Sequence, residues 1–257
     1  MGVLNVTPDS FSDGGRFLDF DAAVDEGLRM VEQGAAIIDV GGESTRPGAA
    51  PVSEEEEIRR VIPVIERLRA FTSAVISVDT SKPQVMRLAT AAGAGLINDV
   101  TALGSEGALE AVVASGSAIC LMHMQGTPRT MQQYPTYVDV VREVRAYLAA
   151  RVQNCLRSGI EADRIVVDPG FGFGKTLEHN LRLLRHLREL STNVPLMVGL
   201  SRKSLVGRLT GRPLAERLHG SVALAVIAVL NGARIVRAHD VSATADAINT
   251  VTAVQDA

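Results

Sequence analysis

The clearest chemical signal in this sequence is a series of polar residues placed where short, β-branched apolar runs end. At or near the end of each of eight runs lies one of these polar residues: Asn5, Asp39, Asp79, Asn98, His123, Asp168, Ser201 and His239. The beginnings of the runs show no such series, because helical stretches lead into them through small residues such as Gly34 and Ala35. A single polar residue of this kind usually forms a turn, but the repetition indicates a shared site.

Three of these residues, Asp79, Asn98 and Asp168, follow strongly apolar runs and are expected to be buried. Buried acids need hydrogen-bonding or charged partners. Two carboxylates and an amide that face one space suit a ligand with several N–H donors, such as the edge of a 2-aminopyrimidinone ring. A site for a hard cation is the alternative, whereas the absence of HxH and HExxH patterns disfavours a transition-metal cluster.

Cationic side chains gather after the last two runs and predict an anion site. Residues 201–204 read Ser-Arg-Lys-Ser and lead into a helical stretch, and the eighth run ends in Arg237 and His239. Backbone N–H groups of a helix that begins at Ser204 can also receive a carboxylate or a phosphate. Phosphate groups commonly bind after the last two strands of α/β barrels.

Three loops have compositions typical of binding segments. Residues 7–15, continuing to about residue 19, are rich in Gly, Ser and Asp, and residues 41–48, which are rich in Gly and hydroxyl residues, resemble them and add Arg46. We interpret both as lids, with plain connections as the alternative. Residues 171–176 (FGFGKT) satisfy neither GxxxxGK[ST] nor GxGxxG. Their glycines predict a backbone that passes close to a ligand, with Phe173 as an aromatic wall.

These residues require a frame that brings the ends of the runs together. The runs cover residues 2–6, 36–40, 75–79, 96–99, 119–122, 165–168, 196–199 and 235–238. Between them, apolar residues recur at helical spacing over residues 22–33, 54–68, 83–92, 108–114, 138–156, 181–190, 214–230 and 244–254. This alternation predicts an α/β fold, a TIM (β/α)8 barrel of parallel strands, with its site at the carboxyl ends of the strands. A doubly wound open sheet is the competing topology.

Helix boundaries support the barrel. Ser53 with Glu56 three residues later is a capping-box candidate, and the acidic residues 54–57 suit the start of a helix better than a metal site. Five glycines follow helical stretches and precede strands, where left-handed caps belong: Gly34, Gly93, Gly116, Gly159 and Gly232.

Composition excludes several classes of function. A net charge of −3 and a pI near 6.0 provide no basic field for nucleic acid. The longest apolar run, residues 222–230, is about half a membrane span. Cys120 and Cys155 form no CxxC and are expected to be reduced, buried thiols. We therefore expect one cytoplasmic domain over residues 1–257 with no membrane or nucleic-acid partner.

Seven ordered motifs resemble those of bacterial dihydropteroate synthases along essentially the whole chain. They lie at residues 5–15, 39–48, 77–82, 97–99, 168–175, 201–204 and 237–239. The resemblance implies a pterin-binding TIM barrel of the folate pathway and a target of sulfonamides. Its reaction joins 6-hydroxymethyl-7,8-dihydropterin diphosphate to 4-aminobenzoate and releases diphosphate.

The resemblance also implies roles for individual residues. The expected catalytic residues are Asp79, Asp168, Lys203 and Arg237. The pterin is expected to contact these four residues together with Asn98 and Met122, with Arg237 stacked on the ring face. The diphosphate is expected to meet Asn5, Thr45, Arg46, Arg237 and His239, with Asn5 as a ligand of the cofactor Mg²⁺. The aminobenzoate pocket is expected to consist of Phe11, Pro47, Phe173 and Ser204.

The chemistry of the reaction predicts an order of steps. Carboxylates beside the pterin would stabilise the positive charge that develops when the methylene C–O bond breaks, so diphosphate is expected to leave before the amine attacks. Two alternatives stay open: a pterin-binding methyltransferase domain, which would not need Arg46 and Lys203, and a non-catalytic pterin-binding protein. A homodimer is expected through the last helices, because residues 214–230 are apolar over much of the helix surface. Family members carry residues before the first strand, so a truncated N-terminus or an open lower face is expected.

Overall fold

The computed structural model describes residues 1–6, 16–44, 51–127, 130–191 and 193–257. In this part of the chain, the eight predicted runs all form strands: β1 (Gly2–Asn5), β2 (Ile37–Gly41), β3 (Val75–Asp79), β4 (Leu96–Asp99), β5 (Ala118–Met122), β6 (Ile165–Asp168), β7 (Met197–Gly199) and β8 (Ile235–Arg237). Every strand pair is parallel, and each observed strand overlaps its predicted range.

The strands close into a barrel. β1 to β6 pair in chain order, and β7 pairs with β8. Backbone hydrogen bonds join these sheets on both sides: on one side Val3 N donates to Ala238 O at 3.1 Å, and on the other Val167 N donates to Pro195 O at 3.0 Å. Because β1 thereby meets β8 and β6 meets the residues before β7, the TIM barrel is confirmed and the open doubly wound sheet is wrong.

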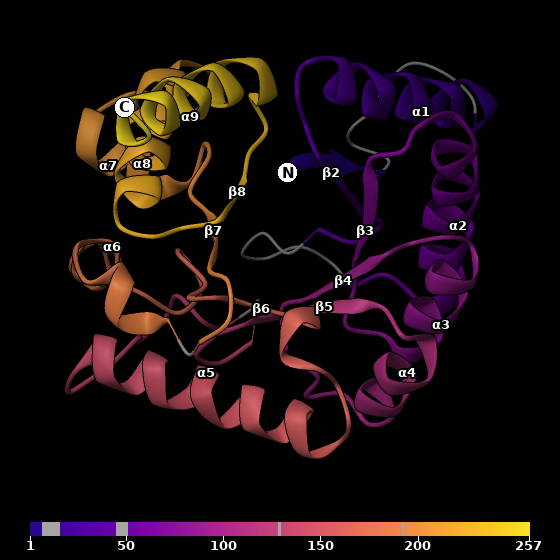
Figure 1. The fold of residues 1–257 in the computed structure, drawn as a ribbon, viewed down its shortest axis with the longest axis horizontal. Coiled ribbons are helices and arrows are strands. Elements are labelled where there is room, and N and C mark those ends of the chain that lie inside the picture. The colour runs from indigo at the N-terminus through magenta and orange to yellow at the C-terminus, as the bar shows by residue number, and fades with distance from the viewer. Residues whose placement is uncertain (7–15, 45–50, 128–129, 192) are drawn as a thin grey trace.

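Helices surround the strands as an outer ring (Figure 1). In the described residues they are α1 (Arg16–Glu32), α2 (Glu54–Phe71), α3 (Pro83–Ala91), α4 (Ala108–Ser115), α5 (Val140–Arg157), α6 (Leu177–Arg185), α7 (Ser204–Thr210), α8 (Leu218–Leu230) and α9 (Val241–Gln255). In the same described ranges, three 3-10 turns accompany them: η2 (Ala162–Arg164), η3 (Leu187–Leu190) and η4 (Leu214–Glu216).

Several helix boundaries differ from the predicted ones. α1 begins at Arg16, before the predicted loop end near residue 19. The helix predicted over residues 214–230 is instead η4 followed by α8, because apolar spacing does not detect the change of backbone direction at Arg217. α6 begins four residues before its predicted start, where Thr176 and His179 form a capping box. The side chain of His179 therefore helps to cap the start of α6.

Other predicted helix boundaries are confirmed. Ser53 Oγ accepts a hydrogen bond from Glu56 N at 3.2 Å at the start of α2. The five glycines predicted as left-handed caps all have positive φ, from 69° at Gly116 to 109° at Gly93. Cys120 and Cys155 are free and buried, as expected.

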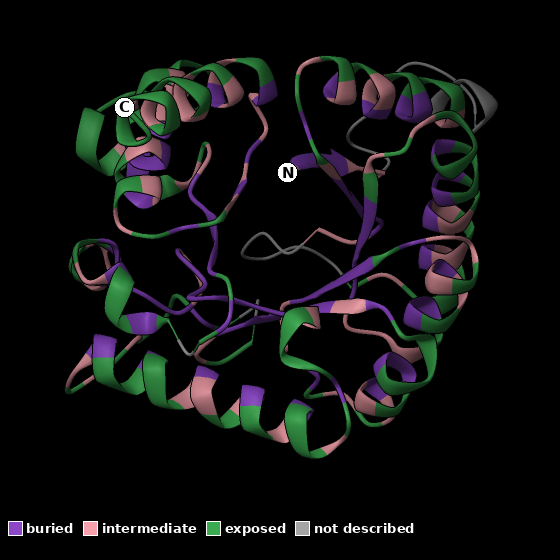
Figure 2. Cartoon of the chain, viewed as in Figure 1, coloured by how far each residue is buried: buried purple, intermediate pink, exposed green. Residues whose placement is uncertain are grey.

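Side chains alternate along each strand between the barrel interior and the helices. A small apolar cluster fills the lower interior: Leu96, Cys120, Val166 and Met197. Asn98 and Asp168 lie two residues further along β4 and β6 and therefore face the same interior space. Ile97 and Val167, between them, belong to the main core that joins strands and helices. Figure 2 shows this core as buried strands and buried inner faces of the surrounding helices.

Candidate active site

A buried carboxylate, Asp39 on β2, is the centre of a hydrogen-bond network at the barrel mouth. Its Oδ1 accepts from Ser77 Oγ at 2.6 Å, and its Oδ2 accepts from Asn98 Nδ2 at 3.0 Å and from Arg237 Nε at 2.6 Å. Arg237 Nη2 also donates to Asp79 Oδ2 at 2.9 Å. The network therefore joins the ends of β2, β3, β4 and β8.

Sequence analysis located Asp39 at a strand end but assigned it no role. Its neighbours on β2, Ile38 and Val40, are fully buried in the outer core, so Asp39 faces the interior. The two-residue alternation along β2 was the signal that could have assigned Asp39 to the site. Its partners, in contrast, are distant in sequence: Arg237 lies 198 residues away.

The network has unusual electrostatics because it is buried. Burial raises the pKa of Asp79 well above its usual range; the charge of Arg237 opposes this shift, and the charge of Asp39 adds to it. Burial alone would lower the pKa of Arg237, but the carboxylates of Asp39 and Asp79 raise it above its usual value. Arg237 is therefore a permanent cation. N–H donors of a ligand that bind Asp79 would favour its charged form.

Asp168 and Met122, both expected at the pterin, lie side by side. They are register partners on β6 and β5, and both are buried. Asp168 Oδ1 accepts a hydrogen bond from Gly170 N at 2.7 Å. Burial raises the pKa of Asp168, and the charge of Lys203 opposes that shift. The mouth thus contains a carboxylate on the side opposite the Asp39 network.

Lys203 reaches across to the loop that follows β6. Its Nζ donates to Phe171 O at 2.5 Å and lies 4.8 Å from the centre of the Phe173 ring. Burial lowers the pKa of Lys203 to about 8, with the charge of Asp168 in opposition. Ser204 is exposed in the first turn of α7. The structure therefore brings Lys203 and Phe173 together, next to Asp168.

Asn5 and His239 occupy the ends of the adjacent strands β1 and β8, and both are half-buried. They line a hollow of about 910 Å³ together with Arg202. Arg202 Nε donates to Asp240 Oδ2 at 3.0 Å, and His239 N donates to Ser201 Oγ at 3.2 Å. The hollow lies between α1 and α9, which face each other in Figure 1.

Four of the predicted site residues lie outside the described residues. They are Phe11, in the predicted segment 7–15, and Thr45, Arg46 and Pro47, in the predicted segment 41–48. Their roles stay predictions.

Lys175 is a buried lysine that sequence analysis did not assign to the site. It is 3% exposed, and its Nζ lies 2.9 Å from His123 Nδ1. Burial lowers the pKa of Lys175 to about 7, with the charge of Asp168 in opposition. Burial and the charge of Lys175 lower the pKa of His123 to about 3, so His123 is neutral. The only sequence signal was a lysine next to a glycine-rich segment that fits no nucleotide motif.

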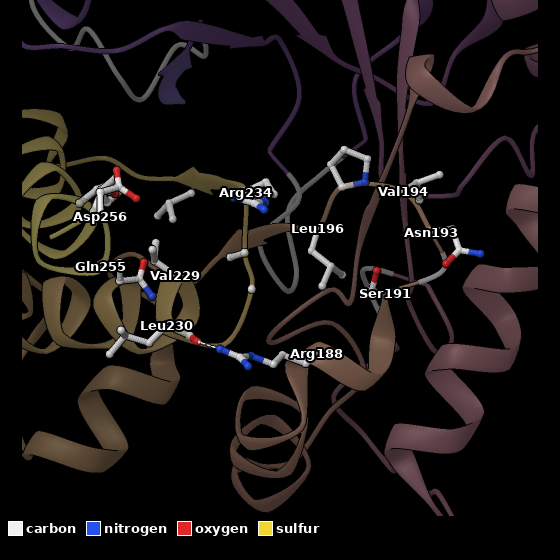
Figure 3. Close-up of a pocket in the computed structure, with 16 residues that line it drawn as sticks. Arg188, Ser191, Asn193, Val194, Leu196, Val229, Leu230, Arg234, Gln255 and Asp256 are labelled. Atoms are coloured by element: carbon white, nitrogen blue, oxygen red, sulfur yellow. Dashed lines mark hydrogen bonds between the residues drawn. The ribbon is translucent and has the colours of Figure 1, made fainter.

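A second hollow, of about 850 Å³, lies at the other end of the barrel. Figure 3 shows Val194 and Leu196, just before β7, on one side of it and Arg234, just before β8, on another. Gln255 and Asp256 at the end of α9 also line it. It is therefore separate from the carboxyl ends of the strands, where the polar network lies.

The described residues contain no group of three or more His, Cys, Asp or Glu side chains arranged to hold a metal ion. Among the helices of the described part of the chain, none is both long and apolar enough to span a membrane.

A closed parallel barrel with inward carboxylates, an amide and cations at its mouth matches a known class of proteins. The family described as pterin binding enzyme matches residues 1–239. This chain belongs to that family.

Similar proteins narrow the class to one activity. The chain is 52% identical to the dihydropteroate synthase of Escherichia coli K12, over 100% of this chain and 92% of that protein. The dihydropteroate synthase of Yersinia pestis, solved with a sulfonamide drug complex, is 50% identical with a TM-score of 0.95, over 100% of this chain and 94% of that one. The Xanthomonas albilineans dihydropteroate synthase in complex with 7,8-dihydropteroate is 50% identical with a TM-score of 0.91, over 100% and 93%. The chain is thus a transferase of the dihydropteroate synthase type.

Proposed function

We propose that this chain, as a single pterin-binding barrel domain over residues 1–257, joins 6-hydroxymethyl-7,8-dihydropterin diphosphate to 4-aminobenzoate and releases diphosphate. The observation that carries the proposal is the convergence of Asp79, Asn98 and Asp168 on one interior space, with Lys203 and Arg237 beside them. Carboxylate and amide oxygens in a dry site suit the N–H-rich edge of a pterin. The product bound by the Xanthomonas relative contains both halves of this reaction.

We assign the pterin to Asp79, Asn98, Met122, Asp168 and Lys203. Arg237 would lie against the ring face while its guanidinium keeps its pairs with the two carboxylates. Departure of diphosphate leaves positive charge delocalised over the pterin. The inward carboxylates stabilise that charge more in the transition state than in the ground state, which favours departure of diphosphate before attack by the amine.

The diphosphate is assigned to the ends of β1 and β8. Asn5 and His239 line the hollow there, and Thr45, Arg46 and Arg237 complete the predicted set. Asn5 offers a carboxamide oxygen, a hard donor of the kind that Mg²⁺ accepts while it keeps waters and phosphate oxygens. One such donor fits a cation held chiefly by the substrate, and bound Mg²⁺ would neutralise charge on the departing diphosphate.

The aminobenzoate is assigned to Phe11, Pro47, Phe173 and Ser204. Phe173 and Lys203 are close neighbours, so the acceptor would lie next to the pterin methylene. An arylamine is largely neutral at pH 7 and attacks without a strong general base. Positioning the two substrates therefore supplies much of the rate.

We further propose a cytoplasmic homodimer. α8 carries two large apolar side chains, Ile227 and Leu230, that are more than 40% exposed. Leu209 on α7 and Leu214 in η4 are also exposed. Exposed large apolar side chains on consecutive helices suit an interface between subunits.

Diphosphate release by the purified protein tests the proposed reaction. We expect release that depends on 4-aminobenzoate and on Mg²⁺, and we expect Asp168→Asn to remove at least about 99% of it, as loss of a transition-state charge interaction does. Asp163→Asn is the matched control, because Asp163 is exposed in η2 at the other end of β6. No release from folded wild-type protein would instead favour the methyltransferase or non-catalytic alternatives.

A further inference from the structure

Four side chains hold the loop after β6, three from elsewhere in the chain and one, Lys175, from the loop itself. The carbonyl oxygens of four consecutive residues each accept a hydrogen bond from one of these side chains: Phe171 from Lys203, Gly172 from Gln132, Phe173 from Lys175 and Gly174 from Tyr137. The Lys175 and Tyr137 bonds are 2.9 and 2.8 Å long. We call these four donors, together with residues 171–174, the carbonyl clamp.

The segment needs such donors because its backbone follows no helix or strand. Gly170, Gly172 and Gly174 all have positive φ, a conformation that glycine adopts readily. The segment also lies directly on the loop after β5. A Cβ atom on Gly170 would lie 1.9 Å from His123 O, and one on Gly174 would lie 2.4 Å from Gln125 O. The two loops are therefore packed backbone to backbone.

Lys175 is the central donor of the carbonyl clamp. Its ammonium group has three protons, and three acceptors surround it: His123 Nδ1 at 2.9 Å, Phe173 O at 2.9 Å and His123 O at 3.4 Å. His123 can accept at Nδ1 because it is neutral. Lys175 thus ties the strand end at His123 to the backbone of Phe173.

Burial of an ammonium group is costly, even when its hydrogen bonds are satisfied. A role for Lys175 in holding one geometry explains why the site tolerates that cost. The geometry concerns the aminobenzoate pocket, because Lys175 holds the backbone of Phe173, whereas the hydrogen bond from Lys203 is made at a different residue of the segment, Phe171.

We propose that Lys175 is a positioning residue: through His123 and the backbone of Phe173, it fixes the aromatic wall of the aminobenzoate pocket without touching either substrate. The assignment of Phe173 to that pocket rests on the proposed function. The pterin edge is held mainly by Asp79, Asn98 and Asp168, so the effect of Lys175 falls on the acceptor amine.

Lys175→Met tests this proposal, because methionine fills similar space and donates no hydrogen bond. We expect the KM for 4-aminobenzoate to rise on the order of tenfold, as loss of a charged hydrogen bond allows. The KM for the dihydropterin diphosphate should stay within about twofold, since no direct pterin contact is lost. Equal rises in both KM values, or a fall in kcat alone, would overturn the proposal.

Tyr137→Phe provides a milder variant if Lys175→Met does not fold. It removes only the hydroxyl that donates to Gly174 O and should produce a smaller rise in the same KM. Arg164→Met is the matched control: Arg164 also donates to a backbone carbonyl, Ser117 O, but below the barrel. It should change neither KM.

Hydrogen exchange provides a readout that does not depend on activity. Lys175→Met should speed amide exchange in residues 170–175 relative to wild type, while exchange in β2 and β3 stays unchanged. Unchanged exchange in residues 170–175 would refute the claim that Lys175 holds this segment. If exchange in Lys175→Met speeds up but the wild-type protein shows no amine-dependent release of diphosphate, the proposed function fails. The claim that Lys175 holds the backbone of Phe173 then still stands.

Discussion

Arg237→Met is the substitution that most directly tests the electrostatic account of the barrel mouth. It would leave Asp39, which is fully buried, and Asp79, which is 9% exposed, without their shared cation. Removal of one partner of a buried pair typically costs about 3–5 kcal/mol. Because the Arg237 side chain is 21% exposed, we expect the lower end, a loss of about 3 kcal/mol in the free energy of unfolding at pH 7.5.

The loss should depend on pH in a definite direction. The folded-state pKa of Asp79 is already raised, so its contribution to stability is present at low pH and disappears as pH rises through that pKa. Arg237 lowers this pKa, and its removal raises it further. The variant therefore binds more protons when folded, and its deficit relative to wild type should shrink between pH 7.5 and pH 5.5.

Urea unfolding at both pH values measures these free energies. Arg164→Met is the control for loss of a half-buried arginine, because its acceptor is the carbonyl of Ser117, which does not titrate. Its cost should be the same at both pH values. A deficit for Arg237→Met below about 1 kcal/mol at pH 7.5, as for an exposed pair, or a deficit that does not change with pH, would refute the reasoning.

Three further predictions concern the loop after β6, the alkaline limb of activity and the proposed dimer. Gly170→Ala should destabilise the fold by several kcal/mol in thermal unfolding, because its Cβ would meet His123 O. Gly159→Ala, also at positive φ but with no atom beyond its chain neighbours within 4 Å, should cost only about 1 kcal/mol. Equal costs for the two substitutions would contradict the close packing of the two loops. Burial lowers the pKa of Lys203 to about 8, so kcat/KM should fall above pH 8 as Lys203 loses its proton. Lys203→Arg should remove this fall, and an unchanged fall in that variant would show that another group titrates. Ile227→Glu should halve the mass seen in light scattering, whereas a wild-type protein that is already monomeric would exclude the proposed dimer.

Local patterns in the sequence were enough to predict the order of strands and helices. They also predicted that the site lies at the carboxyl ends of the strands. Ser53, the cap glycines and the alternation of apolar runs are short-range signals, since hydrogen bonds over a few residues decide helix ends and strand faces. For the same reason, the polar residue at each strand end predicted the end of the barrel at which the polar network lies. The boundaries that were wrong, at Thr176 and Arg217, depend on a cap and a turn that apolar spacing does not detect.

Tertiary structure alone decided which polar groups meet. Asp39 forms a hydrogen bond with Arg237, 198 residues away in the chain, and Lys175 forms one with His123, 52 residues away. Such pairs form because closure of the barrel brings the ends of distant strands to one mouth, and strand register then sets which side chains face the interior. Burial at that mouth also shifts the pKa values of Asp79, Lys175 and Lys203, because desolvation depends on the atoms packed around a charge and not on its neighbours in the chain.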